Sequence, residues 1–243
     1  MAEAPGTIEA APGAQPNPLR EYFDHNPGRL IHKWLHYFDV YHRHFAAYRG
    51  RPITMVELGV FHGGSLQMWR HYFGEQARIV GVDINPACKS LEEDGIEIYI
   101  GDQGDAEFLR RLCSEIGDFH ILIDDGGHIM RQQIVTFEVM FPRLANDGIF
   151  LVEDLHTSYW PEYGGGYKRS AAWLGLGKQR TFIEYAKDLI DALHAWHSRD
   201  PKRLAVSEFT RSARALHFYE SMLVFEKGAV SAPTEKKTGT PSF

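Results

Sequence analysis

The sequence predicts a doubly wound α/β fold whose mostly parallel, seven-stranded sheet ends in a C-terminal antiparallel hairpin. Short apolar runs alternate with helical patterns over residues 55–153, which is typical of a parallel sheet covered by helices on both faces. The length supports one domain, because 243 residues with a hydrophobic content of 44% can bury one sizeable core. Two closing apolar runs without a crossover helix between them predict the hairpin.

The elements are expected in a regular order. An amphipathic helix over 29–48 comes first, because aromatic and aliphatic residues recur there at helical spacing. Five strands follow, separated by helices, and each strand ends at polar or glycine residues. The strands are predicted at 55–58, 78–83, 96–100, 119–124 and 148–153, and the helices at 65–73, 105–116 and 129–144. A helix over 178–197 and hairpin strands over 203–210 and 215–226 complete the domain at 26–228.

The remaining segments lack periodicity. Residues 1–25 and 229–243 are expected to form a flexible arm and a flexible tail, because both are rich in small and turn-forming residues. The segment 154–177 combines many aromatic residues and glycines in one long loop. Loops of that length are usually functional, so a lid over the substrate is predicted there.

Composition excludes several classes of protein. The net charge of −6 gives no basic face for a nucleic acid. The two cysteines have no metal-ligand spacing and indicate no disulfide framework. We find no signal peptide and no run of about 20 apolar residues that could span a membrane. A cytoplasmic protein without membrane contact is therefore expected.

A glycine-rich turn follows the first predicted strand, where open α/β sheets bind their ligands. Glycines in such a turn allow a ligand to approach the backbone. Phe61 replaces the second glycine of a dinucleotide motif, and a carboxylate in the turn disfavours phosphates. A cationic ligand with an amino group, such as S-adenosylmethionine (SAM), fits better; an ordinary turn is the alternative. The candidate cofactor-binding residues of this turn are Glu57, Gly59, Gly63, Gly64 and Ser65.

Polar residues also end the next strands. Asp83 occupies the position of the acidic residue that hydrogen-bonds ribose hydroxyls in nucleotide-binding folds. Asp102 and Gln103 end the third strand, where a polar side chain can meet an adenine amino group. Asp124 ends the fourth strand and is expected either to contact SAM or to cap the turn.

A second group of polar residues indicates a metal site. Asp125 follows the fourth strand, and Glu153 and Asp154 follow the fifth, so the three carboxylates are expected at one rim of the sheet. Unpaired like charges at close range are unfavourable, and a hard divalent cation such as Mg²⁺ or Mn²⁺ removes that cost. Adjacent residues on a straight strand face opposite ways, so both residues of the pair can bind one ion only if the chain turns there.

The same rim carries a candidate base. A hydroxyl group must lose its proton as it attacks a methyl group, and a bound metal lowers the pKa of that hydroxyl. Histidine is the residue type that most often serves as such a base, so His128 is the candidate, with Asp124 as the alternative base. Four lid residues could contact a substrate or could equally close an apolar cap. They are His156, Tyr159, Trp160 and Tyr163.

These motifs resemble a known family. The strings VELGVFHGGSLQMW, ILIDDGGH and IFLVEDLHTSYWPEYGGG are similar to those of the macrocin, mycinamicin and rhamnosyl-tetracenomycin sugar O-methyltransferases, and the resemblance covers residues 50–228. It implies a Rossmann-like class I methyltransferase that transfers a methyl group from SAM to a deoxysugar hydroxyl of a glycosylated antibiotic, such as a macrolide. It implies Mg²⁺ bound by Asp125, Glu153 and Asp154, His128 as the base, and a homo-oligomer.

Other functions stay open at this point. The chain is shorter than family members that carry a separate N-terminal domain, so the sugar and its scaffold are not carried over. The motifs also resemble methyltransferase-fold proteins of the cephalosporin hydroxylase type, which would act on another small-molecule hydroxyl. A nucleotide-binding oxidoreductase and a non-catalytic SAM-binding protein are the further alternatives.

Overall fold

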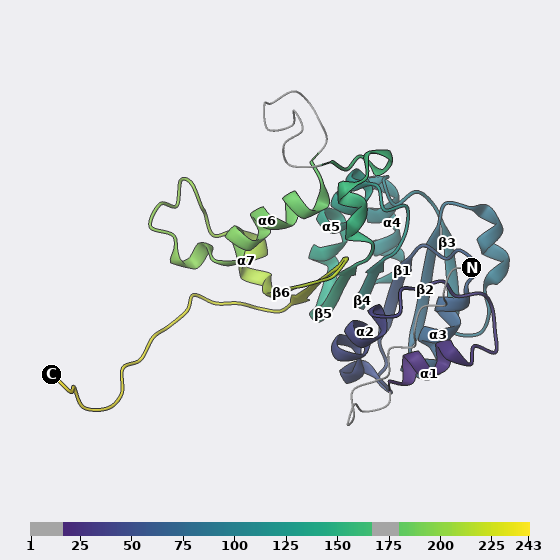
Figure 1. Cartoon of the computed structure of the whole chain (residues 1–243), viewed down its shortest axis with the longest axis horizontal. Coiled ribbons are helices and arrows are strands. Elements are labelled where there is room, and N and C mark those ends of the chain that lie inside the picture. Colours follow the sequence, from purple (N-terminus) through teal and green to yellow (C-terminus); the bar gives the residue numbers. More distant parts are fainter. Residues whose placement is uncertain (1–16, 167–179) are drawn as a thin grey trace, which may run out of the picture.

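The computed structural model describes residues 17–166 and 180–243. A seven-stranded sheet with the strand order β3-β2-β1-β4-β5-β7-β6 forms its centre (Figure 1). The first five strands are parallel, and β7 runs antiparallel to both β5 and β6. The predicted fold is therefore confirmed, hairpin included. The order reverses between β1 and β4, which opens a crevice at the carboxyl ends of these two strands.

The strands are short and buried. The parallel strands carry Val, Ile and Leu on both faces, as expected for a sheet covered by helices on each side. Their bounds are Thr54–Leu58 (β1), Arg78–Asp83 (β2), Ile96–Ile100 (β3), Phe119–Asp124 (β4) and Leu144–Val152 (β5). The hairpin strands are Ala213–Tyr219 (β6) and Met222–Lys227 (β7).

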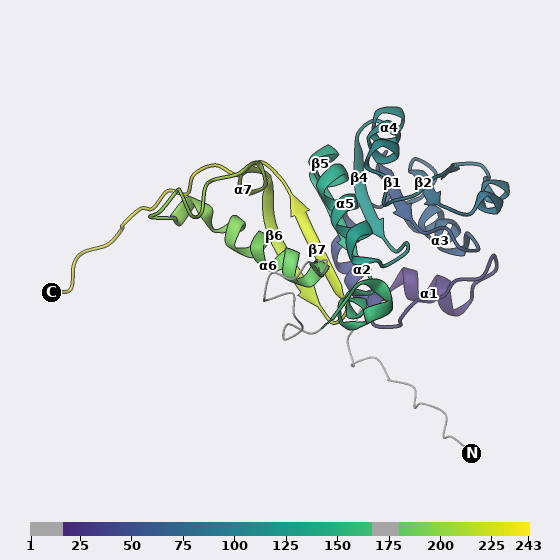
Figure 2. The same ribbon diagram turned by 90° about the horizontal axis from the view of Figure 1, so that it is seen from above.

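Helices form two layers around the sheet (Figures 1 and 2). One face packs against α1 (Pro18–Asp24), α2 (Tyr37–Phe45) and α3 (Gly64–Phe73). The other face packs against α4 (Ala106–Ile116), α5 (Met130–Met140) and α6 (Phe182–Leu193), with the short α7 (Glu208–Ser212) beside them. Each layer encloses its own apolar core, so the carboxyl ends of the strands remain free to build a site.

Short 3₁₀ helices connect these elements. They are η1 (Ala46–Tyr48), η2 (Pro86–Leu91), η3 (Phe141–Arg143), η4 (Leu155–Tyr159), η5 (Pro161–Tyr163) and η7 (Ala195–His197). No helix within the two described ranges is both long and apolar enough to cross a membrane. Both cysteines are buried and unpaired.

The N-terminal region differs from the prediction in two places. The prediction of a flexible arm over residues 1–25 is wrong for Pro18–Asp24. These residues are helical, because the Asn17 side chain caps the helix and Leu19 is buried. The helix predicted over 29–48 begins only at Tyr37. The chain before it crosses Gly64 so closely that a Cβ at this glycine would lie 2.3 Å from the Arg29 carbonyl oxygen. A side chain at position 64 would therefore collide with this non-helical segment.

The strand predicted at 203–210 is also wrong. Ser207 and Thr210 form a capping box, which starts α7 instead of a strand. Both hairpin strands lie within 213–227, joined by a tight turn in which Ser221 has a φ of 59°. Residues 229–243 carry no helix or strand and run away from the sheet in both views (Figures 1 and 2). The predicted lid contains η4 and η5, and its residues 167–177 lie outside the described residues.

Candidate active site

A cavity of about 400 Å³ lies at the carboxyl ends of the parallel strands. Its size and position are typical of a small-molecule site at the switch point of an open α/β sheet. Polar residues predicted from four different strand ends meet here, although they are distant in the sequence. The predicted residues that line the cavity are Gly59, Ser65, Asp83, Asp102, Gln103, Asp125, His128 and Asp154.

Gly59 owes its place to the close approach of two strands. Its φ is 96°, and a Cβ there would lie 2.1 Å from the carbonyl oxygen of Asp125. Only glycine fits this conformation without moving the end of β4. Gly63 and Gly64 do not line the cavity, because they face Arg29 and its neighbours instead. Their contact with a cofactor stays a prediction.

Glu57 is fully buried behind the glycine-rich turn and does not line the cavity. Its carboxylate accepts hydrogen bonds from Ser65 Oγ at 2.6 Å and from Trp69 Nε1 at 3.1 Å. These bonds tie the end of β1 to the first turn of α3. Glu57 therefore holds the turn in place, and its direct contact with a cofactor stays a prediction.

The carboxylates of Asp83 and Asp102 and the amide of Gln103 line the part of the cavity next to β2 and β3. Asp83 Oδ2 accepts hydrogen bonds from the backbone N–H groups of Val60 and Phe61, at 2.9 and 3.1 Å. Gln103 donates to Asp124 Oδ1 at 2.9 Å, and its carbonyl oxygen accepts from Gly127 N at 2.8 Å. Asp83 thus joins the end of β2 to the turn after β1, and Gln103 joins the loop after β3 to the end of β4.

Asp124 lies beneath this surface rather than on it. The residue is fully buried and does not line the cavity. Burial raises the pKa of its carboxyl to about 6, against the lowering effect of the Gln103 hydrogen bond. A group enclosed in this way is poorly placed to reach a substrate proton, which leaves His128 as the better candidate base.

Asp125, His128 and Asp154 form a cluster at the rim of the cavity. His128 Nε2 lies 3.8 Å from Asp125 Oδ1 and 3.4 Å from Asp154 Oδ2. His128 and Asp154 have φ values of 52° and 53°, in the left-handed region that residues other than glycine seldom adopt. The left-handed conformation of Asp154 turns the chain directly after Glu153. This turn places the Asp154 side chain beside His128.

Backbone strain marks the same cavity more generally. Within the described ranges, four residues other than glycine have a positive φ, and three of them line the cavity: Phe61, His128 and Asp154. Such conformations cost free energy and persist at sites where the surrounding structure enforces them. The strain is consistent with a functional rather than a purely structural origin of these turns.

Lys33 lines the same cavity beside the cluster and is a residue that the sequence patterns do not predict. Its ammonium contacts Asp125 Oδ2 at 2.5 Å and Glu153 Oε1 at 2.9 Å, and lies 3.5 Å from Glu57 Oε1. Tyr41 OH donates a further hydrogen bond of 2.5 Å to Glu153. No local pattern signals this lysine, because it lies in the segment predicted as an amphipathic helix and not at a strand end.

The charges around Lys33 do not balance. Burial opposes the charged form of Lys33, but Asp125, Glu153 and Glu57 raise its pKa well above the ordinary value. Burial also raises the pKa of Glu153 and of Glu57. One ammonium thus faces three carboxylates, and Asp154 adds a fourth at the rim. Acidic groups therefore outnumber the one ammonium, and a further cation would favour their ionised forms over the protonated ones.

The rim cluster fits a divalent cation. Ligand atoms of Asp125, His128 and Asp154 all lie within 4.8 Å of one another. Carboxylate oxygens suit Mg²⁺ or Mn²⁺, and one imidazole is compatible with the latter. Among the described residues, His128 Nδ1 is one of the few buried polar atoms without a hydrogen-bond partner. Glu153 is held by Lys33 and Tyr41; its role as a ligand stays a prediction and requires Lys33 to move.

The predicted lid residues divide between two places. Tyr163 lies near the rim, with its ring centroid 6.5 Å from that of His128. His156 and Tyr159 instead line a second cavity between η4, α6 and the hairpin, where His156 Nδ1 lies 2.5 Å from Ser221 Oγ. Trp160 is half exposed and packs edge-on against His156. Their contact with a substrate stays a prediction.

The strand order, the hairpin and the position of the cavity define the chain as a protein of the Rossmann-like class I methyltransferase fold. Its curated relatives with 34–39% identity over most of this chain are sugar O-methyltransferases. No family model matches.

Two relatives show the extent of the similarity. The chain is 39% identical over 208 residues to the 8-demethyl-8-(2-methoxy-alpha-L-rhamnosyl)-tetracenomycin-C 3'-O-methyltransferase of Streptomyces olivaceus, which covers 83% of this chain and 51% of the relative. It is 36% identical to the mycinamicin VI 2''-O-methyltransferase of Micromonospora griseorubida, over 80% of this chain and 49% of the relative. The chain therefore spans about half the length of the curated relatives that it matches.

A solved structure shows the same fold. The MycE methyltransferase of the mycinamycin pathway, in complex with Mg, SAH and mycinamycin VI, matches this chain with a TM-score of 0.75. The sequence identity is 31%, and the match covers 88% of this chain and 54% of MycE.

Proposed function

We propose that this chain is a SAM-dependent, Mg²⁺- or Mn²⁺-assisted O-methyltransferase that acts on a deoxysugar hydroxyl of a glycosylated natural product. One observation carries the proposal. The acid–imidazole cluster of Asp125, His128 and Asp154 opens into the same cavity that Asp83 and Gln103 line. A nucleoside cofactor and an acceptor hydroxyl can therefore meet in one place. The sugar O-methyltransferases among the relatives agree with this chemistry.

Different residues around the cavity would contact different parts of SAM. Asp83, whose carboxylate is fixed by three backbone N–H groups, lies where it can accept hydrogen bonds from ribose hydroxyls. Asp102 and Gln103 lie where the adenine ring would be placed, at the end of β3. Gly59 leaves room for the amino-acid portion beside β1. SAM itself supplies the electrophilic methyl group, and the chain supplies its orientation.

The rim cluster holds the groups that activate the acceptor. Asp125 and Asp154 would hold the divalent ion, which supplies positive charge that lowers the pKa of the acceptor hydroxyl. His128 lies within reach of the same point and accepts the hydroxyl proton through an imidazole nitrogen. The Lys33 ammonium contacts Asp125 Oδ2, so it either positions this carboxylate for the ion or competes with the ion for it, and Lys33→Met separates the two roles.

We also propose a homo-oligomer. Leu30, Trp34 and Leu35 are each more than half exposed, and Leu30 also lines the cavity. Large apolar side chains gathered on one exposed segment are typical of a surface that a partner covers. Light scattering of the purified chain would give a mass above that of one copy if a second copy covers this segment.

The first test is calorimetric titration of SAM into the full chain with and without Mg²⁺. We expect saturable SAM binding, and a Mg²⁺ isotherm that disappears in Asp125→Ala. Asp94→Ala is the matched control, because Asp94 is an exposed acidic residue outside the cavity. Methyl transfer from labelled SAM to rhamnosylated tetracenomycin and to mycinamicin VI then tests the acceptor class.

The outcomes separate the alternatives. Failure to bind SAM would overturn the central claim. SAM binding without Mg²⁺ affinity would remove the metal and leave His128 acting alone. SAM and Mg²⁺ binding without turnover on any glycosylated acceptor would favour a different small-molecule hydroxyl.

A further inference from the structure

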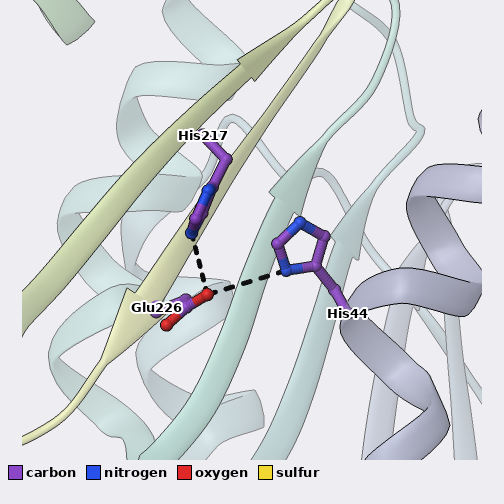
Figure 3. A group of neighbouring side chains, drawn as sticks. All are labelled: His44, His217 and Glu226. Carbon is purple, nitrogen blue, oxygen red and sulfur yellow. Dashed lines mark hydrogen bonds and ion pairs between the residues drawn. The ribbon is translucent and has the colours of Figure 1, made fainter.

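A second cluster of metal-ligating side chains lies outside the active site. His44 in the last turn of α2, His217 in β6 and Glu226 in β7 point toward one another (Figure 3). Their ligand atoms all lie within 4.8 Å of one another. His217 Nε2 is 2.8 Å from Glu226 Oε1, and His44 Nδ1 is 3.8 Å from the same oxygen. None of the three lines the active-site cavity.

The register of the hairpin brings two of these residues together. Glu226 pairs with Ala215 and His217 pairs with Val224, so His217 and Glu226 are diagonal neighbours on one face of the antiparallel pair. This is the face on which Val224 and Met222 pack in the same core as α2. The last turn of α2 therefore delivers His44 to the two hairpin side chains, although it is distant in the sequence.

The His44 ring is prepared for coordination. Its Nε2 lies 2.8 Å from the Tyr219 hydroxyl, which leaves Nδ1 directed at Glu226. A partner on the second ring nitrogen is the usual way in which proteins fix a metal-binding histidine. The His44 side chain is also shielded from solvent, with an exposed fraction of 6%.

We propose that His44, His217 and Glu226 form a second metal site, which takes a transition ion such as Zn²⁺ rather than Mg²⁺. Two imidazoles and one carboxylate are a ligand set that zinc uses, with the fourth position left to water. Tetrahedral zinc places its ligand atoms about 3.3 Å apart. The observed separations of 2.8 and 3.8 Å lie on either side of that value. Mg²⁺ prefers oxygen ligands and belongs at the rim cluster instead.

Such an ion would link two regions that the active site depends on. The helix α2 carries Tyr37 and Tyr41, whose hydroxyls hold Asp154 and Glu153. The hairpin carries Ser221, which contacts Tyr37 and His156. A metal bound only by the folded chain stabilises that chain by mass action, so the ion would fasten α2 to the hairpin.

The experiment isolates this site from the rim cluster. The full chain, freed of metal with a chelator, carries Asp125→Ala to disable the rim cluster and is titrated with Co²⁺ in the presence of excess Mg²⁺. We expect one equivalent of Co²⁺ with visible absorption bands, displaced by Zn²⁺, and a rise in Tm on addition of Zn²⁺. The bands and the Tm rise should disappear when His217→Ala or Glu226→Gln is added, with circular dichroism confirming the fold of each variant.

Two further variants complete the experiment: the first is a matched control, and the second probes the hydrogen-bond partner of His44. His42→Ala removes another histidine of α2, whose side chain hydrogen-bonds Tyr72 and not the metal-site residues. This variant should retain the Co²⁺ spectrum. Tyr219→Phe removes only the partner of His44 and should weaken binding by about 10-fold. The proposal fails if the Asp125→Ala protein binds no Co²⁺ or Zn²⁺, or if binding survives both His217→Ala and Glu226→Gln.

Discussion

The two clusters that could hold a metal ion differ in how the chain builds them. Asp125, His128 and Asp154 follow the ends of parallel strands, and two of them have a positive φ. His44, His217 and Glu226 lie within a helix and two strands, and none of them is among the residues of positive φ. The first cluster borders a cavity of about 400 Å³ and the second does not.

The difference indicates different tasks. A strained turn is stable only when neighbouring contacts enforce it, and here those contacts come from Lys33, Tyr37 and the Gly59 turn. Side chains on regular elements need no such support and suit a site whose task is to connect elements. We therefore assign the chemistry to the strained cluster and a structural role to the regular one, and substitutions in each cluster can test that assignment.

The largest effect is expected at His128. His128→Ala removes the proposed base and should lower kcat by about 10²- to 10⁴-fold, the usual contribution of a general base. SAM affinity, measured by calorimetry, should stay unchanged, because His128 serves the acceptor side. His42→Ala is the control. Unchanged Mg²⁺ affinity would favour the base alone, whereas reduced affinity would make His128 a ligand. Full activity in His128→Ala would contradict both roles.

Lys33 gives the next largest effect. Lys33→Met leaves the carboxylates of Glu57, Asp125 and Glu153 without their ammonium and should lower the free energy of unfolding by about 3–5 kcal/mol without metal. If Glu153 is a metal ligand, the same variant should bind Mg²⁺ more tightly, because the competing ammonium is gone. Urea unfolding with and without Mg²⁺ measures both.

Lys202→Met, which removes an exposed lysine outside the cavity, is the matched control and should change little. If Lys33→Met were as stable as the wild type, the carboxylates would be neutralised by protons rather than by Lys33. If its Mg²⁺ affinity fell, Lys33 would act as a positioning residue for Asp125 and not as a competitor of the metal.

The sequence predicts much of the fold and the rim cluster, for a common reason. Strands and helices alternate with clear periods, and carboxyl ends of parallel strands meet at one edge, so the sequence pattern alone places Asp125, His128 and Asp154 together. The same pattern cannot place Lys33, because the position of this lysine depends on a non-helical path across Gly64 that no local signal encodes.

The C-terminal region teaches a related lesson. The segment before β6 has apolar residues compatible with a strand, but Ser207 and Thr210 carry a capping signal that favours a helix. The cluster of His44, His217 and Glu226 is not predicted by the sequence either, because it needs both the hairpin register and the packing of α2 on the sheet. Contacts between distant elements decide what local patterns leave open.

A substitution of Gly59 is expected to have a smaller effect on the strained region. Gly59→Ala forces a side chain into a φ of 96° and places its Cβ 2.1 Å from the Asp125 carbonyl oxygen, so β4 must shift. We expect a loss of about 1–3 kcal/mol in the free energy of unfolding. Gly117→Ala has a similar φ of 75° but open space around its Cβ. Gly117→Ala should lose a similar free energy of unfolding through its backbone but should bind Mg²⁺ like the wild type, whereas Gly59→Ala should bind it more weakly. Equal Mg²⁺ affinity in both variants would refute the clash.

The smallest effect is expected at Tyr37. This residue and His44 lie at opposite ends of one helix, so a substitution of Tyr37 can test whether the two clusters are independent. Tyr37 OH donates a 2.7 Å hydrogen bond to Asp154 Oδ1 from the first turn of α2, whereas His44 lies in the last turn. Tyr37→Phe should weaken Mg²⁺ binding by about 10-fold, as loss of a partner behind a metal ligand does. Calorimetry should show unchanged Zn²⁺ affinity at the second cluster. If both affinities fell together, the substitution would be displacing the whole of α2, and the two clusters would be coupled through that helix rather than independent.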